Sequence, residues 1–174
     1  IKANCPTTQV LLYMIHSFPN GDPYRCSDDP PVCTYEGMYE RITTNHLNMG
    51  RLLNVPIAPC AVVWNEMLAT YGDLGYWNND GIHPLPLGSY MSACTIFATM
   101  FGQSPAGGYA LPSLSTEVVN NISTVVTNVV LDDSSSWCQS HHPPTGQLVT
   151  NFNTGKQYPS IKNAIWAARP GEKI

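Results

Sequence analysis

Two residues that can carry acid–base chemistry stand three apart in the segment NNDGIHPLPLGSYMSA, residues 78–93. Glycine and proline punctuate the stretch around Asp80 and His83, which is typical of a loop. A carboxylate that accepts a hydrogen bond from histidine Nδ1 fixes the tautomer and leaves Nε2 free to take a proton from a nucleophile. The spacing therefore predicts a general base with its orienting acid. A helix-capping Asp beside a surface His would give the same pattern.

The elements around this loop are those of a parallel sheet with crossover helices. Continuous apolar runs at 9–18 and 55–64 are typical of buried strands. Helical spacing of apolar residues predicts a helix over 34–53, and residues 65–71 add a short second helix. A strand, helix, strand order favours a parallel pair, and ligands bind at the carboxyl edge of such sheets. The Asp80–His83 loop follows this unit, so we expect it at that edge.

Two further helices and a less patterned tail are predicted downstream. Residues 85–102 place aromatic side chains on one helical face and end at a glycine. In 118–129, valine and isoleucine recur at spacings of three and four, which indicates a helix, although β-branched residues also suit a strand. From residue 132 onward the pattern fades, with one short strand in GQLVTNF and one short helix in YPSIKNAIWAA.

Three segments resemble the SGNH hydrolases, the GDSL esterase and lipase superfamily. DGIHPLPLGSYMSACTIFATMFGQSP resembles the last block of that family, in which the catalytic Asp and His have this spacing and precede a proline, a glycine and a helix. VPIAPCAVVWNEM is similar to the strand and short helix before that block, and VLLYMIHSFPNGDP to an upstream core strand. TYEGMYERITTNHLNMGRLL would be the helix between the two strands. The resemblance spans residues 8–106.

The resemblance implies an α/β fold, namely part of a three-layer α/β/α sandwich with a parallel, flavodoxin-like sheet whose N-terminal strands are absent from this chain. It implies ester hydrolysis through a serine acyl-enzyme, with His83 as the base and Asp80 as its orienter. Neither a metal nor an organic cofactor is implied. An ester substrate is expected, such as an acetyl or other ester carried on a polysaccharide. Residues 1–106 would be the C-terminal portion of such a domain, and 107–174 a C-terminal extension of one helix and a loop-rich tail.

The sequence departs from the family at the nucleophile. The family's serine lies in a Gly-Asp-Ser type motif after the first strand, and this sequence contains no such motif. Ser17 follows a strand but lacks the context of a nucleophile elbow. Two buried strands also cannot cover their own sheet edges. We therefore expect a preceding N-terminal segment or a partner chain to complete the site, or self-assembly to cover the edge.

Composition favours a folded, secreted chain. Hydrophobic residues make up 43% of the sequence and charged residues 11%, enough apolar content for a core. A net charge of −4 with scattered Lys and Arg excludes a basic surface for nucleic acid, and no apolar run approaches the ~20 residues of a membrane span. Six cysteines favour an oxidising, extracellular setting. Cys26 and Cys33 are the predicted disulfide, whereas Cys60 and Cys94 suit either a disulfide or buried thiols. Asn121 begins a glycosylation motif.

Several side chains near the pair are candidates for substrate contact. Trp64, Glu66 and Trp77 are predicted to bind substrate, with core burial of the tryptophans and a surface position for the glutamate as the alternatives. Cys138 and its neighbouring histidines could ligate a metal, but structural zinc needs about four ligands and the sequence offers no second cluster. No metal site is therefore predicted. His16, at the end of a strand, is expected to be structural.

Two functions from different classes fit these observations. The first is an extracellular serine esterase of SGNH type, seen as a fragment that lacks its nucleophile block. The second is a non-catalytic secreted structural or assembly-forming protein that reuses this half-fold. A serine within reach of His83, supplied by another segment or chain, would discriminate between them.

Overall fold

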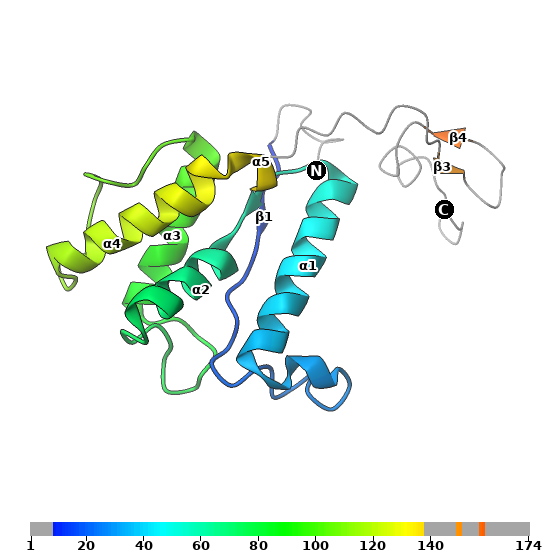
Figure 1. Ribbon diagram of the computed structural model, residues 1–174, viewed down its shortest axis with the longest axis horizontal. Coiled ribbons are helices and arrows are strands. Elements are labelled where there is room, and N and C mark those ends of the chain that lie inside the picture. Colours follow the sequence, from blue (N-terminus) through cyan, green and yellow to red (C-terminus); the bar gives the residue numbers. More distant parts are fainter. Residues whose placement is uncertain (1–8, 138–148, 151–156, 159–174) are drawn as a thin grey trace.

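Two short parallel strands lie at the centre of the computed structural model, which describes residues 9–137, 149–150 and 157–158 (Figure 1). Strand β1 (Leu12–Tyr13) pairs with β2 (Ile57–Ala58) in parallel, with Leu12 opposite Ile57. The described part of the chain is thus mixed α/β, mostly helical, with a small parallel sheet. This confirms the α/β class and the parallel pairing of the two apolar runs.

The sequence predicts strands over 9–18 and 55–64, but neither run is a strand over its full length, and β1 covers Leu12–Tyr13 alone. Strand β2 ends at Ala58, and helix α2 (Cys60–Tyr71) begins two residues later with Pro59 as its N-cap. A proline provides no backbone N–H for a strand ladder, yet it is tolerated where a helix starts. The prediction was wrong here because an apolar run of this kind fits a buried helix as well as a buried strand.

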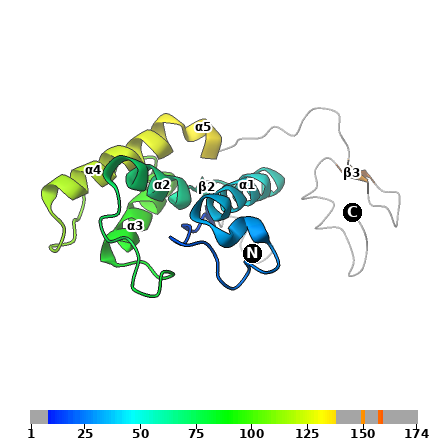
Figure 2. The same ribbon diagram turned by 60° about the horizontal axis from the view of Figure 1, so that its bottom comes forward.

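Helix α1 (Tyr35–Leu53) connects the two strands, as predicted for residues 34–53. The short 3₁₀ helix η1 (Pro30–Cys33) precedes it. The Thr34 hydroxyl caps α1 by accepting the Gly37 N–H at 3.1 Å. Asn54, in the left-handed conformation with a φ of 50°, ends the helix. In two views α1 lies on one side of the strands and α2, α3 and α4 lie on the other (Figures 1 and 2).

The helices after β2 share one apolar core. The downstream elements are α3 (Pro86–Phe101), α4 (Thr116–Val126), the π-helical segment η2 (Thr127–Asp132) and α5 (Ser134–Trp137). The helical interpretation of the valine-rich segment is confirmed. Ile122, Val125 and Val126 of α4 pack in the same cluster as the apolar residues of α2 and α3. The division at residue 106 remains a prediction, but α4 belongs to the core on which α3 packs.

A separate antiparallel pair, β3 (Val149–Thr150) with β4 (Gln157–Tyr158), lies in the tail. The short helix predicted for 158–168 starts at Tyr158, which belongs to β4, and the rest of that range lies outside the described residues. Among the helices of the described ranges, none combines the length and apolar character that a bilayer span requires.

Cys26 and Cys33 form the predicted disulfide in the loop before α1, with Cα atoms 4.7 Å apart. Cys60 and Cys94 are buried free thiols, which decides between the two alternatives for these residues. The disulfide is compatible with secretion.

Replacing both Cys26 and Cys33 by serine is expected to lower the free energy of unfolding by about 2 kcal/mol. The bond closes a loop with a sequence separation of 7 residues, so it removes only a modest conformational entropy from the unfolded chain. Urea denaturation followed by circular dichroism measures the change, with Ser27→Ala as a control inside the same loop. A double variant as stable as the wild type would show that the loop is ordered without the bond.

Candidate active site

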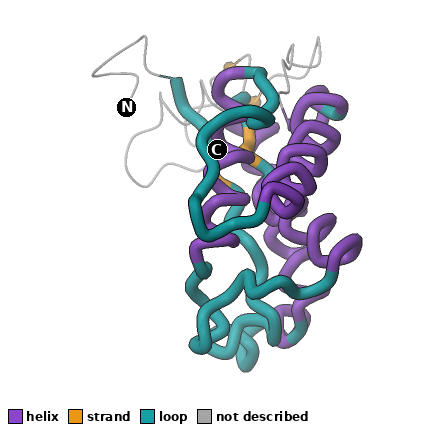
Figure 3. The backbone as a smooth tube through the Cα atoms, turned by 90° about the vertical axis from the view of Figure 1, so that its left-hand side faces the viewer, coloured by secondary structure: helices purple, strands orange, loops and turns teal. Residues whose placement is uncertain are grey.

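The loop between α2 and α3, residues 72–85, is hairpin-like and carries the predicted pair, Asp80 and His83. Trp77 and Pro84 form an antiparallel bridge across its arms, and the Asn78 N–H donates to the His83 carbonyl at 2.8 Å. In the tube view, loops gather at the lower end of the molecule (Figure 3). Backbone contacts between Trp77 or Asn78 and His83 or Pro84 therefore hold the two sides of the loop together.

The structure brings Asp80 and His83 together. Nδ1 of His83 lies 2.7 Å from Oδ2 of Asp80, while Oδ1 accepts the backbone N–H groups of Ile82 at 2.9 Å and His83 at 3.0 Å. Gly81 permits this close turn because its φ of 68° lies in the left-handed region. Helix α3 is instead preceded by Leu85, which makes no side-chain capping bond, so Asp80 does not cap that helix.

The hydrogen bond between Asp80 and His83 has the direction that a general base and its orienting acid require. An ionised carboxylate only accepts hydrogen bonds, so Nδ1 of His83 carries the hydrogen and Nε2 is the basic nitrogen. The side chain of His83 is 74% exposed and that of Asp80 43%. Nε2 is thus available to a reactant from outside.

We expect the carboxyl of Asp80 to titrate well below its ordinary pKa of 3.8. The hydrogen bond with His83 and those from two backbone N–H groups favour the ionised form and lower the pKa of Asp80 to about 2. The stabilising effect of the carboxylate on the loop is complete above the ordinary pKa and is lost as pH falls through about 2. A titration of the side-chain carboxyl ¹³C resonance measures this. A midpoint near 4 would show that the bonds to Asp80 are not formed in solution.

The segment that follows β1 contacts this loop at two consecutive residues. Nε2 of His16 lies 3.1 Å from the carbonyl oxygen of Ile82, and the indole N–H of Trp77 donates to the carbonyl of Ser17 at 3.0 Å. The loop therefore lies against the segment that leaves the carboxyl end of β1, where the order of elements predicts it. The sequence predicts a structural role for His16 but not its partner, since a contact across 66 positions leaves no local signal.

Ser17 contacts the loop through its carbonyl, but its hydroxyl is not paired with His83. Ser17 is 1% exposed, and its Oγ has no hydrogen-bond partner among the described residues. Within the same residues, the ring of His83 is hydrogen-bonded to Asp80 alone. The described part of the chain thus contains an acid and a base without a nucleophile in contact with them.

The two tryptophans predicted to bind substrate have different surroundings. Trp77 is part of the loop itself, half-buried, with its ring edge-on to Tyr35 at a centroid distance of 6.2 Å. Trp64 is only 1% exposed, stacks on the ring of His16 and donates its indole N–H to Ser92 Oγ at 3.1 Å. Trp64 is therefore a core residue beneath the loop, and its predicted substrate contact is corrected to packing. The role of Trp77 stays a prediction.

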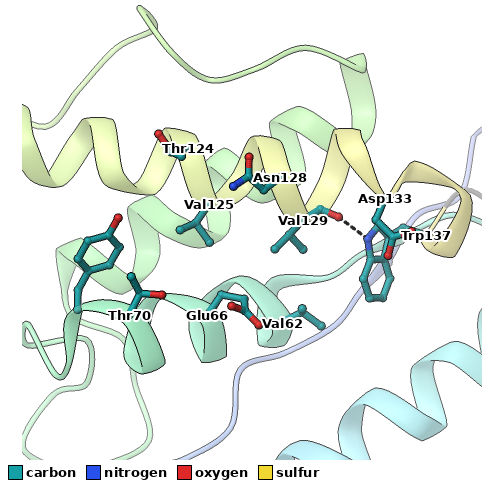
Figure 4. A pocket seen from close by; sticks show the side chains of 10 residues that line it. Val62, Glu66, Thr70, Thr124, Val125, Asn128, Val129, Asp133 and Trp137 are labelled. Carbon is teal, nitrogen blue, oxygen red and sulfur yellow. Dashed lines mark hydrogen bonds between the residues drawn. The ribbon is translucent and has the colours of Figure 1, made fainter.

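Glu66 lies away from the pair, on the face of α2 turned toward α4 (Figure 4). It lines a depression of about 470 Å³ between these helices. The other lining residues are Val62, Thr70, Tyr71, Thr124, Val125, Asn128, Val129, Asp133 and Trp137. None of them belongs to the loop of Asp80 and His83, so the structure does not bring Glu66 to the candidate site.

The remaining predicted residues lie elsewhere. Asn121 is a half-buried residue of α4, and Ser123 of the same motif is buried with its hydroxyl donating to Val119 at 2.9 Å. Glycosylation there stays a prediction. Cys138 and its neighbouring histidines lie outside the described residues. Within those residues, no three His, Cys, Asp or Glu side chains are grouped to hold a metal ion.

No protein-family model and no curated protein matches the chain. A solved structure with a similar fold is that of a DUF4886 family protein from Bacteroides uniformis, with a TM-score of 0.61 and 19% sequence identity. The similarity covers 71% of this chain and 48% of that protein. The chain therefore spans about half the length of this structural neighbour. At this level of identity the likeness shows the fold alone.

Proposed function

We propose that this chain supplies the base and the orienting acid of an extracellular serine ester hydrolase of SGNH type. The observation that carries the proposal is the 2.7 Å contact between His83 Nδ1 and Asp80 Oδ2, with Nε2 free and exposed. Nε2 takes the proton of a serine hydroxyl while that oxygen attacks the ester carbonyl, and then delivers the proton to the leaving alkoxide. Asp80 stays ionised throughout and stabilises the imidazolium.

The proposal includes the finer fold, in which this chain is part of a three-layer α/β/α sandwich. Helices on both sides of the β1–β2 pair support it (Figure 1). Within the described residues β1 pairs with β2 alone, and Tyr13 on β1 and Ile15 just after it are partly exposed. An open strand edge flanked by apolar side chains suits a further strand of the same sheet.

In this proposal the nucleophilic serine lies outside the described residues, in a preceding segment or a partner chain that pairs with the open edge of β1. Such pairing would bring the carboxyl end of an added parallel strand beside the Asp80–His83 loop. The substrate is an ester, such as an acetyl group on a carbohydrate, and Trp77 beside the pair offers a ring for a sugar face. The chemistry needs no metal or organic cofactor.

Labelling with a fluorophosphonate tests the proposal, because this probe reacts with activated serine hydroxyls. The native protein, with every chain that co-purifies, is labelled and then analysed by denaturing intact mass. We expect an adduct that disappears in His83→Ala and persists in His46→Ala, since His46 lies on α1 with Nδ1 bonded to its own helix. The mass of the labelled chain identifies the polypeptide that carries the serine. An adduct on no chain would overturn the esterase proposal.

The exposed apolar side chains beside β1 also favour a second candidate, a non-catalytic secreted protein that assembles through this edge. That candidate predicts no adduct, and an unchanged assembly size in His83→Ala. Light scattering combined with size-exclusion chromatography measures the assembly, and Tyr13→Lys should dissociate it. Loss of labelling with intact assembly in His83→Ala would instead favour the esterase.

A further inference from the structure

His16 is a buried polar residue that contacts the candidate site. It is 3% exposed, and its ring stacks on the indole of Trp64 with centroids 4.1 Å apart and planes 10° apart. Its Nε2 lies 3.1 Å from the carbonyl oxygen of Ile82. Two different elements, helix α2 and the Asp80–His83 loop, therefore contact one ring in the segment that follows β1.

The partner of His16 determines its tautomer. A carbonyl oxygen only accepts, so Nε2 carries the hydrogen and Nδ1 keeps a lone pair. Nδ1 is buried and has no hydrogen-bond partner among the described residues. Burial also lowers the pKa of His16, against a smaller opposing effect of the bond to Ile82, and the nearby His83 lowers it further. The ring is consequently a neutral donor at physiological pH.

The backbone of Ile82 connects His16 to the candidate base, His83. Its N–H donates to Asp80 at 2.9 Å and its carbonyl accepts from His16 at 3.1 Å. The next residue is His83, whose ring is 74% exposed and hydrogen-bonded to Asp80. The hydrogen bonds of the Ile82 N–H and carbonyl hold the backbone that leads into His83, and so help to set where its ring meets Asp80.

We propose that His16 is a positioning residue that holds the Ile82–His83 peptide and thereby keeps the His83 ring aligned with Asp80. It acts through the Ile82 carbonyl and touches no reacting atom. A role of His16 in catalysis rests on the proposed esterase function, whereas its effect on the alignment of Asp80 and His83 does not. If His16 only filled the core, any aromatic residue of similar size that stacks on Trp64 could replace it without effect on the pair.

Two variants separate these roles. His16→Phe keeps an aromatic ring against Trp64 and removes the donor, whereas His16→Gln loses the stacking ring but retains an N–H group at the reach of Nε2. The first readout is the carboxyl titration of Asp80 in the full chain, which requires no substrate. We expect the pKa of Asp80 to rise by about one unit in His16→Phe, equivalent to a roughly tenfold weaker preference for the ionised form, and to stay low in His16→Gln.

A measurement on the wild type keeps the proposal falsifiable if a variant does not fold. The Nε2–H resonance of His16 should be visible in ¹⁵N-edited spectra, exchange slowly with solvent and correlate with Nε2, the protonated nitrogen. A neutral ring protonated at Nδ1, or a rapidly exchanging Nε2–H, would overturn the proposal. An unchanged titration of Asp80 in a folded His16→Phe variant would overturn it equally.

The second readout is ester hydrolysis by protein that has not been treated with the fluorophosphonate. His16→Phe should lower kcat by about 10- to 100-fold, with a KM within a factor of about two, and His16→Gln should recover most of the rate. Equal losses in both variants would contradict a role for the donor. If the native protein forms no fluorophosphonate adduct, the esterase function fails, but the Asp80 titration still decides whether His16 aligns the pair.

Discussion

Replacing His83 by alanine is expected to slow hydrolysis of a soluble aryl acetate by roughly 10²- to 10⁴-fold, with little change in stability. The loss is large because a serine hydroxyl is a weak nucleophile until a base removes its proton. Stability should change little because the His83 side chain is 74% exposed and its ring is hydrogen-bonded to the neighbouring Asp80. The initial rate at pH 8 measures activity, and the thermal midpoint measures stability.

Two controls make this result interpretable. His46→Ala removes a histidine from α1 and should retain the wild-type rate, which controls for general effects of losing an imidazole. Asp80→Asn should also lower the rate, since an amide cannot stabilise the imidazolium, while keeping a side chain of the same shape. A His83→Ala protein that is folded and as active as the wild type would contradict the role given to the pair.

The acid–base pair could be predicted because its geometry is local. Asp80 and His83 are three residues apart, and the backbone N–H groups of Ile82 and His83 fix the carboxylate in place. Helical periodicity likewise identified α1 and α4, whose apolar residues recur along one face. Such features depend on neighbours within a few positions, which the sequence displays directly.

Contacts between distant segments could not be predicted in the same way. His16 meets Ile82 and Trp64 only after β1 and the loop are folded together, so a histidine at the end of a strand carried no sign of either partner. The sequence predicts a substrate contact for Trp64 because this residue stands near the loop in the chain, yet α3 packs over it. The burial of Trp64 depends on α3, an element that follows it in the sequence.

Gly88, the third residue of α3, packs directly against the buried ring of Trp64. A Cβ atom at Gly88 would overlap the six-membered ring of Trp64 and lie 2.7 Å from the carbonyl oxygen of Tyr76. Neither neighbour can yield easily. Trp64 is stacked on His16 and hydrogen-bonded to Ser92, and Tyr76 is held by its backbone bond to Leu85.

Gly88→Ala is therefore expected to lower the free energy of unfolding by about 2 kcal/mol. Overpacking of a rigid core costs about 1–3 kcal/mol or more, and the higher helix propensity of alanine offsets at most about 1 kcal/mol of it. Ser89→Ala, at the next and exposed position of α3, should change stability by less than about 0.5 kcal/mol. Urea denaturation of the two variants measures the difference. Because Trp64 stacks on His16, the Gly88→Ala variant should also show a raised pKa of Asp80. A Gly88→Ala protein of wild-type stability would show that α3 does not pack tightly against Trp64.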